Sequence, residues 1–360
     1  MQRRNFIRQN LALAISTASL AVVPAGLRGQ ARAASAEPLQ IGTPQGSPLR
    51  IGMVELDTSH SDTLGGVISA LEGAELTAVL NRGLVYGEQR TASFVKDYRV
   101  KHVCSTPEQM VPLVDVALVV GCDWESHVSD AEPFIAAGKP VFIDKPCVGT
   151  EADARRLLEL SLRYRTPVFG GTIYRYSANL QEFKERYQSR PDKVILTVYG
   201  RIHSHSRNDM HDLIYYGIHG TEVMQEVVGL GAVAVNYLDF YRKEHLIHVS
   251  YGDRPPVVLV LGYALDGPQL SLLADKGLDH LVPVAENGYV KMLAAMSRSL
   301  STGRAERPIA EQVEACRILI AARKSRTLGR QVYLDELEEG DGFDGRSFGL
   351  EYARFRNLDR

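Results

Sequence analysis

The stretch AGKPVFIDKP, residues 137–146, decides the fold. It closes a predicted helix over 131–137, continues as a short apolar strand over 140–143, and then changes to the polar pair Asp144 and Lys145. Ligands on parallel sheets bind at the carboxyl ends of the strands. The polar residues that follow each predicted strand are therefore the first candidates for a functional site.

Strand and helix patterns alternate on the N-terminal side of this stretch. Predicted strands cover 49–54, 75–80 and 114–120, and predicted helices cover 62–72 and 89–97. This alternation predicts an α/β fold that begins with a Rossmann-like, doubly wound parallel sheet. Beyond Lys193 the pattern changes to apolar β segments, which predict a second domain of mixed α/β structure. These segments cover 194–203, 233–241, 246–251 and 257–264.

The chain divides into five predicted parts. They are a leader (1–33), a linker (34–48), the Rossmann-like domain (49–170), a second α+β domain (171–335) and a tail (336–360). A closing helix near 307–327 is expected to pack back on the first domain.

The leader resembles an export signal. Residues 3–8, RRNFIR, fit the twin-arginine pattern, an apolar stretch follows, and the small residues around Arg32 fit a cleavage site. The alternative is an uncleaved membrane anchor, which the many Ala and Ser residues disfavour. The leader predicts a periplasmic or otherwise exported protein with no stable membrane insertion after cleavage. Because the twin-arginine route carries folded proteins, it also suggests a cofactor loaded before export.

Charge and composition exclude several classes of protein. The formal net charge is −2, and removal of the leader with its five arginines would make it −7. A nucleic-acid binder would carry a basic excess, so we expect no nucleic-acid partner. The 45% of hydrophobic and 23% of charged residues are typical of a globular protein. Four cysteines in a chain of this length do not indicate a disulfide framework.

The turn after the first strand departs from a dinucleotide-binding fingerprint. Glu55, Asp57 and His60 stand where glycines would let backbone N–H groups approach a pyrophosphate. Two carboxylates there would repel phosphate. Asp57, Thr58 and Ser59 are also good helix caps, and free N–H groups at the helix start can still hold an anion. Both readings of Asp57, a cap and part of a cofactor site, stay open.

Candidate cofactor contacts follow the next strands as well. Asn81 and Arg82 replace the acidic residue that binds the ribose of NAD, which favours NADP, although a surface arginine is the default interpretation. Further candidates follow the third strand; they are Cys122, Asp123, Trp124 and His127.

Several segments together resemble one enzyme family. AGKPVFIDKP resembles the AGKHVxxEKP segment of the Gfo/Idh/MocA oxidoreductases, the superfamily of glucose-fructose oxidoreductase and inositol dehydrogenase. YRYS (174–177) is similar to the opening of that family's second domain, YGIHGTEVM (216–224) to its GxHxxD helix, and residues 308–334 to its closing helix and strand. The resemblance implies a second domain with an open, mostly antiparallel sheet, and a homo-oligomer.

The resemblance also implies a chemistry. Family members transfer a hydride between a hydroxyl-bearing carbon of a sugar or cyclitol and a nicotinamide, which needs a base and a cationic donor. By resemblance, Lys145 is the donor and His219 the base, with NAD or NADP as cofactor. Many members carry an Asp one helical turn before this His, where this chain has Tyr215. Tyr215, Tyr216 or Asp212 can replace it as a proton relay.

Two further sets of residues complete the predictions. The first is a substrate-binding set for a carbohydrate-like small molecule, formed by Tyr174, Arg175, Tyr176, Arg201 and Tyr216. The second is an alternative metal site at His203, His205 and His211, for which His-x-His spacing is weak evidence. The alternative function is a protein of the same fold without redox chemistry, acting as a metal-assisted carbohydrate lyase or hydrolase, or as a sugar-binding module.

Overall fold

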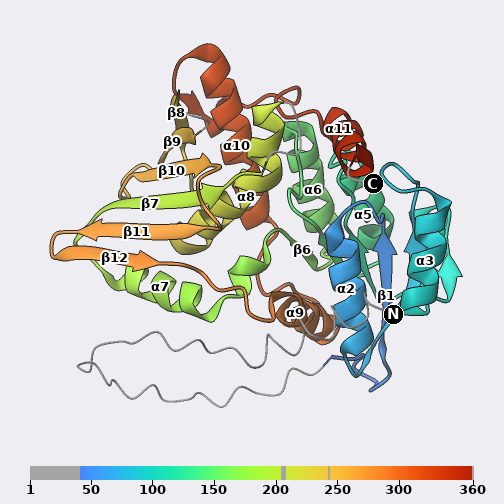
Figure 1. Cartoon of the computed structure of the whole chain (residues 1–360). Helices are drawn as coiled ribbons and strands as arrows, with labels where there is room; N and C mark the ends of the chain where they lie inside the picture. The colour runs from blue at the N-terminus through green and yellow to red at the C-terminus, as the bar shows by residue number, and fades with distance from the viewer. Residues whose placement is uncertain (1–40, 204–207, 242–243, 359–360) are drawn as a thin grey trace, which may run out of the picture. The chain divides into compact units, whose positions relative to one another are not determined.

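The computed structural model describes residues 41–203, 208–241 and 244–358 (Figure 1). The predicted leader and most of the predicted linker lie outside these residues. Within them, no helix is long and apolar enough to cross a membrane.

The first half of the chain builds a six-stranded sheet in which every pair of neighbours is parallel. The strand order is β3-β2-β1-β4-β5-β6. The strands are β1 (Leu49–Val54), β2 (Ala74–Leu80), β3 (His102–Val103), β4 (Val116–Val119), β5 (Val141–Ile143) and β6 (Val168–Gly170). The helices are α2 (Ser59–Ala70), α3 (Glu88–Tyr98), α4 (Pro107–Met110), α5 (His127–Ala136) and α6 (Glu151–Tyr164). The predicted doubly wound α/β fold is confirmed.

Strands β1 and β4 are neighbours although two strands lie between them in sequence. The chain therefore reverses its direction of travel through the sheet at this point, and a crevice opens outside the carboxyl ends of the two strands in folds of this kind. The strands are nearly continuous apolar runs because both sheet faces are covered; all four residues of β4 are buried.

The second half builds a seven-stranded sheet in the order β12-β11-β7-β10-β9-β8-β13. Its strands are β7 (Lys193–Arg201), β8 (Ala234–Tyr241), β9 (Glu244–Ser250), β10 (Val257–Gly262), β11 (Gln269–Ala274), β12 (Gly277–Leu281) and β13 (Val332–Tyr333). Only the β7–β10 pair is parallel among the described strands of this sheet. Alternate residues of β9 are buried, as in a sheet with one covered face. The expected mostly antiparallel second sheet is confirmed.

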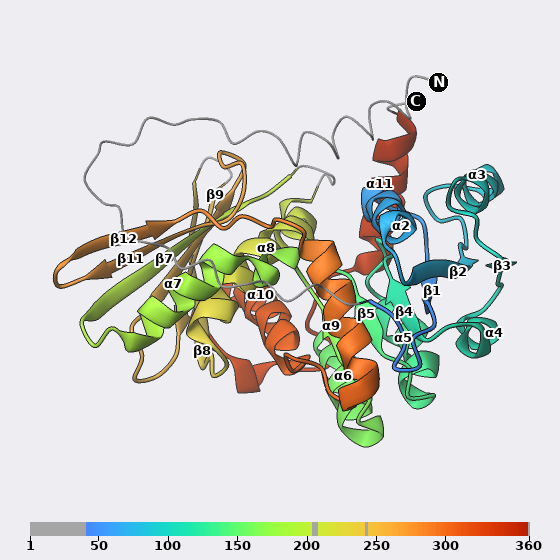
Figure 2. The same ribbon diagram turned by 90° about the horizontal axis from the view of Figure 1, so that it is seen from below.

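Helices α8 and α10 cover this sheet (Figure 1). The helices of this half are α7 (Ala178–Ser189), α8 (Asp209–Val228), α9 (Gly288–Thr302), α10 (Ala310–Leu328) and α11 (Gly345–Leu358), with 3-10 turns at Ile173–Tyr176 and Leu334–Glu336. A further 3-10 turn, Val111–Leu113, precedes β4 in the first half. Helix α10 also packs against α6 (Figure 2), where Arg317 holds the Glu151 carboxylate with two hydrogen bonds of 2.7 and 3.0 Å. Helix α10 therefore contacts the first half of the chain.

The predicted tail contains an ordered helix, α11. Phe348 and Tyr352 lie four residues apart, on one face of the helix, and both are buried. This face packs on the loops that follow β2 and β4, so the end of the chain reaches the edge of the parallel sheet where ligands bind.

Candidate active site at the edge of the parallel sheet

A cavity of about 110 Å³ lies where the loops after β5 and β6 meet helix α8. The residues that line it are His60, Asp144, Lys145, Gly171, Thr172, Ile173, Tyr174, His219, Ala285 and Tyr289. Lys145 and His219, the two predicted catalytic residues, are therefore brought together from parts of the chain more than 70 residues apart.

Lys145 lies at the carboxyl end of β5 and is 4% exposed. Its Nζ donates to the carbonyl oxygen of Tyr215 (3.1 Å) and lies 3.8 Å from the centre of the Tyr215 ring. Burial lowers the pKa of Lys145 to about 8, against the opposing attraction of Asp144 and Glu222. The ammonium form therefore still predominates near neutral pH, and its remaining N–H groups are available to a substrate oxygen.

His219 projects from α8 beside Lys145. Its Nδ1 lies 2.8 Å from the Thr172 hydroxyl, and its ring packs against the edges of Tyr174 and Tyr216. Burial, and then the charge of Lys145, lower the pKa of His219 well below its usual value. The imidazole is therefore neutral, and its Nε2 has no hydrogen-bond partner among the described residues, as a proton acceptor requires.

The predicted relay residues lie outside the cavity lining. Tyr215 is buried against Lys145, packs on Phe348 at a ring distance of 4.4 Å, and supports the lysine through its ring and its carbonyl oxygen. Asp212 is buried one turn earlier and accepts a long hydrogen bond (3.4 Å) from the Tyr263 hydroxyl.

A pair that sequence reasoning did not find completes the cavity. The Nδ1 of His60 lies 2.5 Å from Oδ2 of Asp144, and the other carboxylate oxygen of Asp144 accepts from the backbone N–H of Lys145 (2.8 Å). His60 was predicted only as a cofactor contact, and Asp144 was given no role. Their contact joins the turn after β1 to the loop after β5, a separation of 84 residues that no local pattern reveals.

The turn after β1 keeps a backbone conformation that glycine favours, but a glutamate stands at this position. Glu55 has φ 70°, a left-handed conformation that is uncommon for a residue with a side chain. Its carboxylate accepts from the backbone N–H (3.1 Å) and guanidinium (2.7 Å) of Arg82. Burial raises the pKa of Glu55 to about 7.

The predicted nucleotide contact Arg82 is engaged by two acids. Besides Glu55 it binds the carboxylate of Asp130 with two guanidinium nitrogens. Asn81 donates to the carbonyl of Tyr86 (3.0 Å) and to the Thr91 hydroxyl (2.9 Å). Both residues therefore stabilise the loop after β2 in this structure, and the 2′-phosphate contact that the sequence suggests stays a prediction.

Asp57 closes the crevice between β1 and β4. Its Oδ2 accepts from the backbone N–H of Cys122 (3.2 Å), while its Oδ1 is buried without a hydrogen-bond partner. The cap of α2 is Thr58, whose hydroxyl accepts from the N–H of His60 (3.2 Å); Ser59 is the first residue of the helix. The capping role considered for Asp57 therefore belongs to Thr58.

Helix α11 covers the same crevice. Trp124, which is 0% exposed, stacks on Phe348 at a ring distance of 4.9 Å and donates to the Phe343 carbonyl (3.0 Å). A Cβ on Gly349 would lie 3.7 Å from Cys122 Sγ and 2.8 Å from Leu84, so the helix is in contact with the loops after both β4 and β2.

These observations test the fit of a dinucleotide. In folds of this kind it lies along the crevice between β1 and β4, with its phosphates at the turn after β1. Here that turn carries Glu55 and Asp57, the crevice is bridged by Asp57 and Cys122, and α11 lies over it. In the conformation of this structure, the crevice does not fit a dinucleotide.

The remaining predicted cofactor residues connect these loops. The ring nitrogens of His127 lie 3.0 Å from the carbonyl oxygens of Gly121 and Pro146, tying the loop after β4 to that after β5. Asp123 lies 3.5 Å from the Arg346 guanidinium of α11.

The predicted substrate-binding residues separate into different places. Tyr174 lines the cavity, and Tyr216 packs on His219 at its side. Arg201 lies at the end of β7, 3.6 Å from the exposed Asp266.

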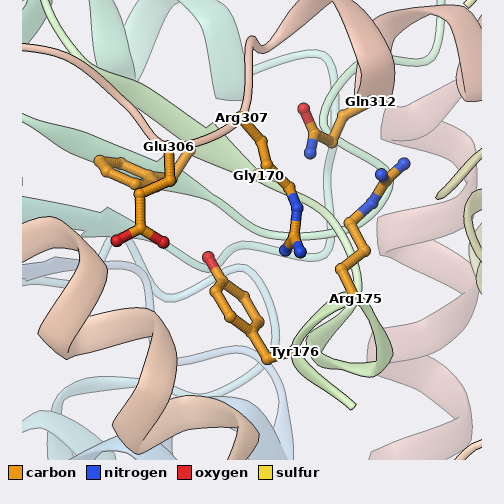
Figure 3. A pocket seen from close by; sticks show the side chains of 7 residues that line it. Gly170, Arg175, Tyr176, Glu306, Arg307 and Gln312 are labelled. Carbon is orange, nitrogen blue, oxygen red and sulfur yellow. The ribbon is translucent and has the colours of Figure 1, made fainter. Parts of the chain in front are cut away.

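Arg175 is 1% exposed and lies in an ion cluster with Glu222 (3.2 Å) and Glu226 (3.1 Å). With Tyr176 it lines a separate, narrow recess of about 10 Å³ (Figure 3). The structure thus places Arg175 in the protein interior, away from the cavity lining.

No group of three metal-ligating side chains occurs within the described residues. His203 packs on the Tyr216 ring, and His211 lies near Trp124 and Phe348. His205 lies outside the described residues.

The chain is similar to a family of oxidoreductases. Residues 49–169 match the Gfo/Idh/MocA family, described as "Oxidoreductase family, NAD-binding Rossmann fold". The inositol 2-dehydrogenase of Cereibacter sphaeroides is 28% identical over 162 residues, which span 44% of this chain and 46% of that protein; that of Acidiphilium cryptum is 27% identical over the same shares. The chain thus matches about half the length of these relatives.

Solved structures share the fold over most of the chain. The scyllo-inositol dehydrogenase of Lactobacillus casei, solved with NAD(H) and scyllo-inositol, has a TM-score of 0.69 at 13% identity and covers 81% of this chain and 100% of its own. The myo-inositol 2-dehydrogenase of Lactobacillus plantarum has a TM-score of 0.68 at 13% identity and covers 80% and 99%. Residues 49–169 of this chain are therefore similar in sequence to the NAD-binding Rossmann domain of the Gfo/Idh/MocA oxidoreductases, and the solved structures share its fold.

Proposed function

We propose that this protein is an enzyme that acts on a polyhydroxylated small molecule, a sugar, cyclitol or glycoside, bound in the cavity of Lys145 and His219. The observation that carries the proposal is the meeting of a buried ammonium and a neutral imidazole in one cavity at the ligand-binding edge of the sheet. The sequence similarity to inositol 2-dehydrogenases supports the substrate class.

The first candidate reaction is hydride transfer between a hydroxyl-bearing carbon and NAD or NADP. The family of residues 49–169 supports it. The nicotinamide would supply the hydride acceptor, and α11 has to leave the crevice before a dinucleotide fits. A tightly held nucleotide, export by the twin-arginine route, a periplasmic location and a homo-oligomer are further parts of this proposal, supported by the leader sequence and the family resemblance.

The protein's own residues have defined tasks in this reaction. The Lys145 ammonium donates to the substrate oxygen and stabilises negative charge that develops on it. The neutral His219 accepts the hydroxyl proton at Nε2, while Thr172 holds its Nδ1. Tyr215 holds Lys145 in place through its ring and carbonyl oxygen.

The second candidate is redox-neutral chemistry on the same class of substrate. The carboxylates of Glu55 and Asp57 and the position of α11 favour it, because they occupy the place of the nucleotide.

Mass spectrometry of the natively purified protein, followed by addition of NAD and NADP, separates the two candidates. A bound nucleotide, or NADH formation from inositols or sugars, supports the first. Absence of bound nucleotide together with no binding of added nucleotide contradicts the first and leaves the second.

A further inference from the structure

His60 and Asp144 form a hydrogen-bonded imidazole–carboxylate pair that faces the cavity. Burial alone would raise the pKa of Asp144, but His60 and Lys145 outweigh burial and hold the pKa below its usual value. Asp144 is therefore ionised and accepts the Nδ1 proton of His60. In a neutral ring with its proton on Nδ1, the lone pair lies on Nε2, and this atom has no hydrogen-bond partner among the described residues.

The cavity thus holds two imidazole rings, each hydrogen-bonded through Nδ1 to a different partner. His60 is oriented by a carboxylate, which stabilises the charged imidazolium once it has taken a proton. His219 is oriented by the Thr172 hydroxyl, and burial followed by the charge of Lys145 favours its neutral form. Of the two, His60 is the one whose ring is held by a carboxylate, the partner arrangement of a general base.

We propose that His60 and Asp144 are an acid–base pair that gives this cavity a redox-neutral activity, the removal of a proton from the carbon beside a ketone in a keto-sugar or keto-cyclitol. The inference rests on the second candidate function, redox-neutral chemistry in this cavity, and names its substrate class and its base.

The step balances within the cavity and the substrate. His60 Nε2 takes the proton from the carbon next to the carbonyl, and the C–H electron pair becomes the new C=C bond. The carbonyl π electrons move onto the oxygen, where the Lys145 ammonium donates a hydrogen bond to the enolate. Return of the proton from the imidazolium to the carbon regenerates a ketone, so no oxidant or reductant is consumed.

Exchange of hydrogen for deuterium tests the step directly. The probe is 2-keto-myo-inositol in D₂O with nucleotide-free, full-length protein, and NMR follows the protons beside the carbonyl. We expect the wild-type protein to accelerate exchange on the order of 100-fold over buffer, the lower end for acid–base catalysis. His60→Gln should abolish this acceleration, and Asp144→Asn should reduce it at least about 10-fold. His102→Gln, an exposed histidine on β3, is the matched control and should exchange at the wild-type rate.

A second measurement, made on the wild-type protein, tests the proposal even if the variants fold poorly. Long-range ¹H–¹⁵N spectra of the histidine rings in the wild-type protein should show His60 protonated at Nδ1, and Asp144→Asn should remove this tautomer preference. A proton fixed on Nε2 of His60 would overturn the proposal.

The outcomes also separate this inference from the oxidoreductase proposal. No exchange by the wild-type protein, or undiminished exchange by a folded His60→Gln variant, overturns the inference. Exchange that requires added NAD overturns it and supports the oxidoreductase proposal. Nucleotide-free exchange with no NAD binding supports the inference and contradicts that proposal.

Discussion

The Asp57 carboxylate accepts a hydrogen bond of 3.2 Å from the backbone N–H of Cys122, and so joins the loops after β1 and β4 at the point where folds of this kind bind a dinucleotide. Directly above, α11 stacks Phe348 on Trp124. The cofactor edge of the sheet is closed by the protein itself, while the cavity of Lys145 and His219 beside it remains open.

Trp124 is the chain's single tryptophan, so its fluorescence reports whether α11 stays in place. If a nucleotide has to displace α11, weakening the Phe348 contact should help it bind. A Phe→Ala change in a packed site costs about 3–5 kcal/mol, so Phe348→Ala should weaken the packing of α11 on Trp124. We therefore expect this variant to bind NAD at least about 10-fold more tightly than the wild-type protein. Its Trp124 emission should shift to the red. Leu350→Ala, on an exposed position of α11, is the control. Equal NAD affinity in all three proteins with unchanged emission would show that α11 does not compete with the nucleotide.

The buried Glu55 should make the free energy of unfolding depend on pH. Its pKa is raised by burial to about 7 in the folded protein, against a usual value of 4.5, so the folded state binds the extra proton between these values. The stabilisation from that proton is present below about pH 4.5 and is lost as the pH rises through about 7, by at most about 3 kcal/mol. Urea unfolding should show this loss in the wild-type protein, and Glu55→Gln should reduce it, whereas the exposed Glu88→Gln should not. An identical pH dependence in wild type and Glu55→Gln would contradict the assignment.

Tyr215 distinguishes a proton relay from a support for Lys145. The ring and the carbonyl oxygen hold the lysine, and both survive in Tyr215→Phe. We expect Tyr215→Phe to keep kcat within about 3-fold of wild type and Tyr215→Leu to lower it about 10-fold or more, since a desolvated cation–π contact contributes about 2 kcal/mol. A large loss of kcat in Tyr215→Phe would instead identify the hydroxyl as a relay.

Arg175 should matter for stability. Arg175→Met removes the cation that pairs with the buried Glu222, whereas Glu226 keeps Lys184 and Arg307. We expect the uncompensated Glu222 to lower the free energy of unfolding by about 3–5 kcal/mol. Arg186→Met, which breaks the exposed ion pair with Asp279, should cost at most about 1 kcal/mol. If Arg175→Met has unchanged stability but a raised KM, Arg175 binds the substrate, as the sequence analysis predicts.

The sequence predicted those features that have a local pattern. Strand and helix periodicity predicted the parallel sheet, and AGKPVFIDKP pointed to the edge where Lys145 lies. Helix α11 was missed because its pattern was interpreted as a tail, although Phe348 and Tyr352 have helical spacing. The His60–Asp144 pair and the engagement of Arg82 by Glu55 and Asp130 depend on contacts between distant segments, which periodicity does not encode.

Lys145 provides the most direct test that the cavity is an active site. The measurement is the pH dependence of kcat/KM for wild type and Lys145→Met, in NADH formation from inositols and sugars and in nucleotide-free exchange of 2-keto-myo-inositol. The account predicts a wild-type rate that falls above about pH 8, where Lys145 loses its proton, and a loss of at least about 100-fold in a folded Lys145→Met variant. Wild-type kcat/KM in Lys145→Met, or a wild-type protein inactive in both assays, would contradict it.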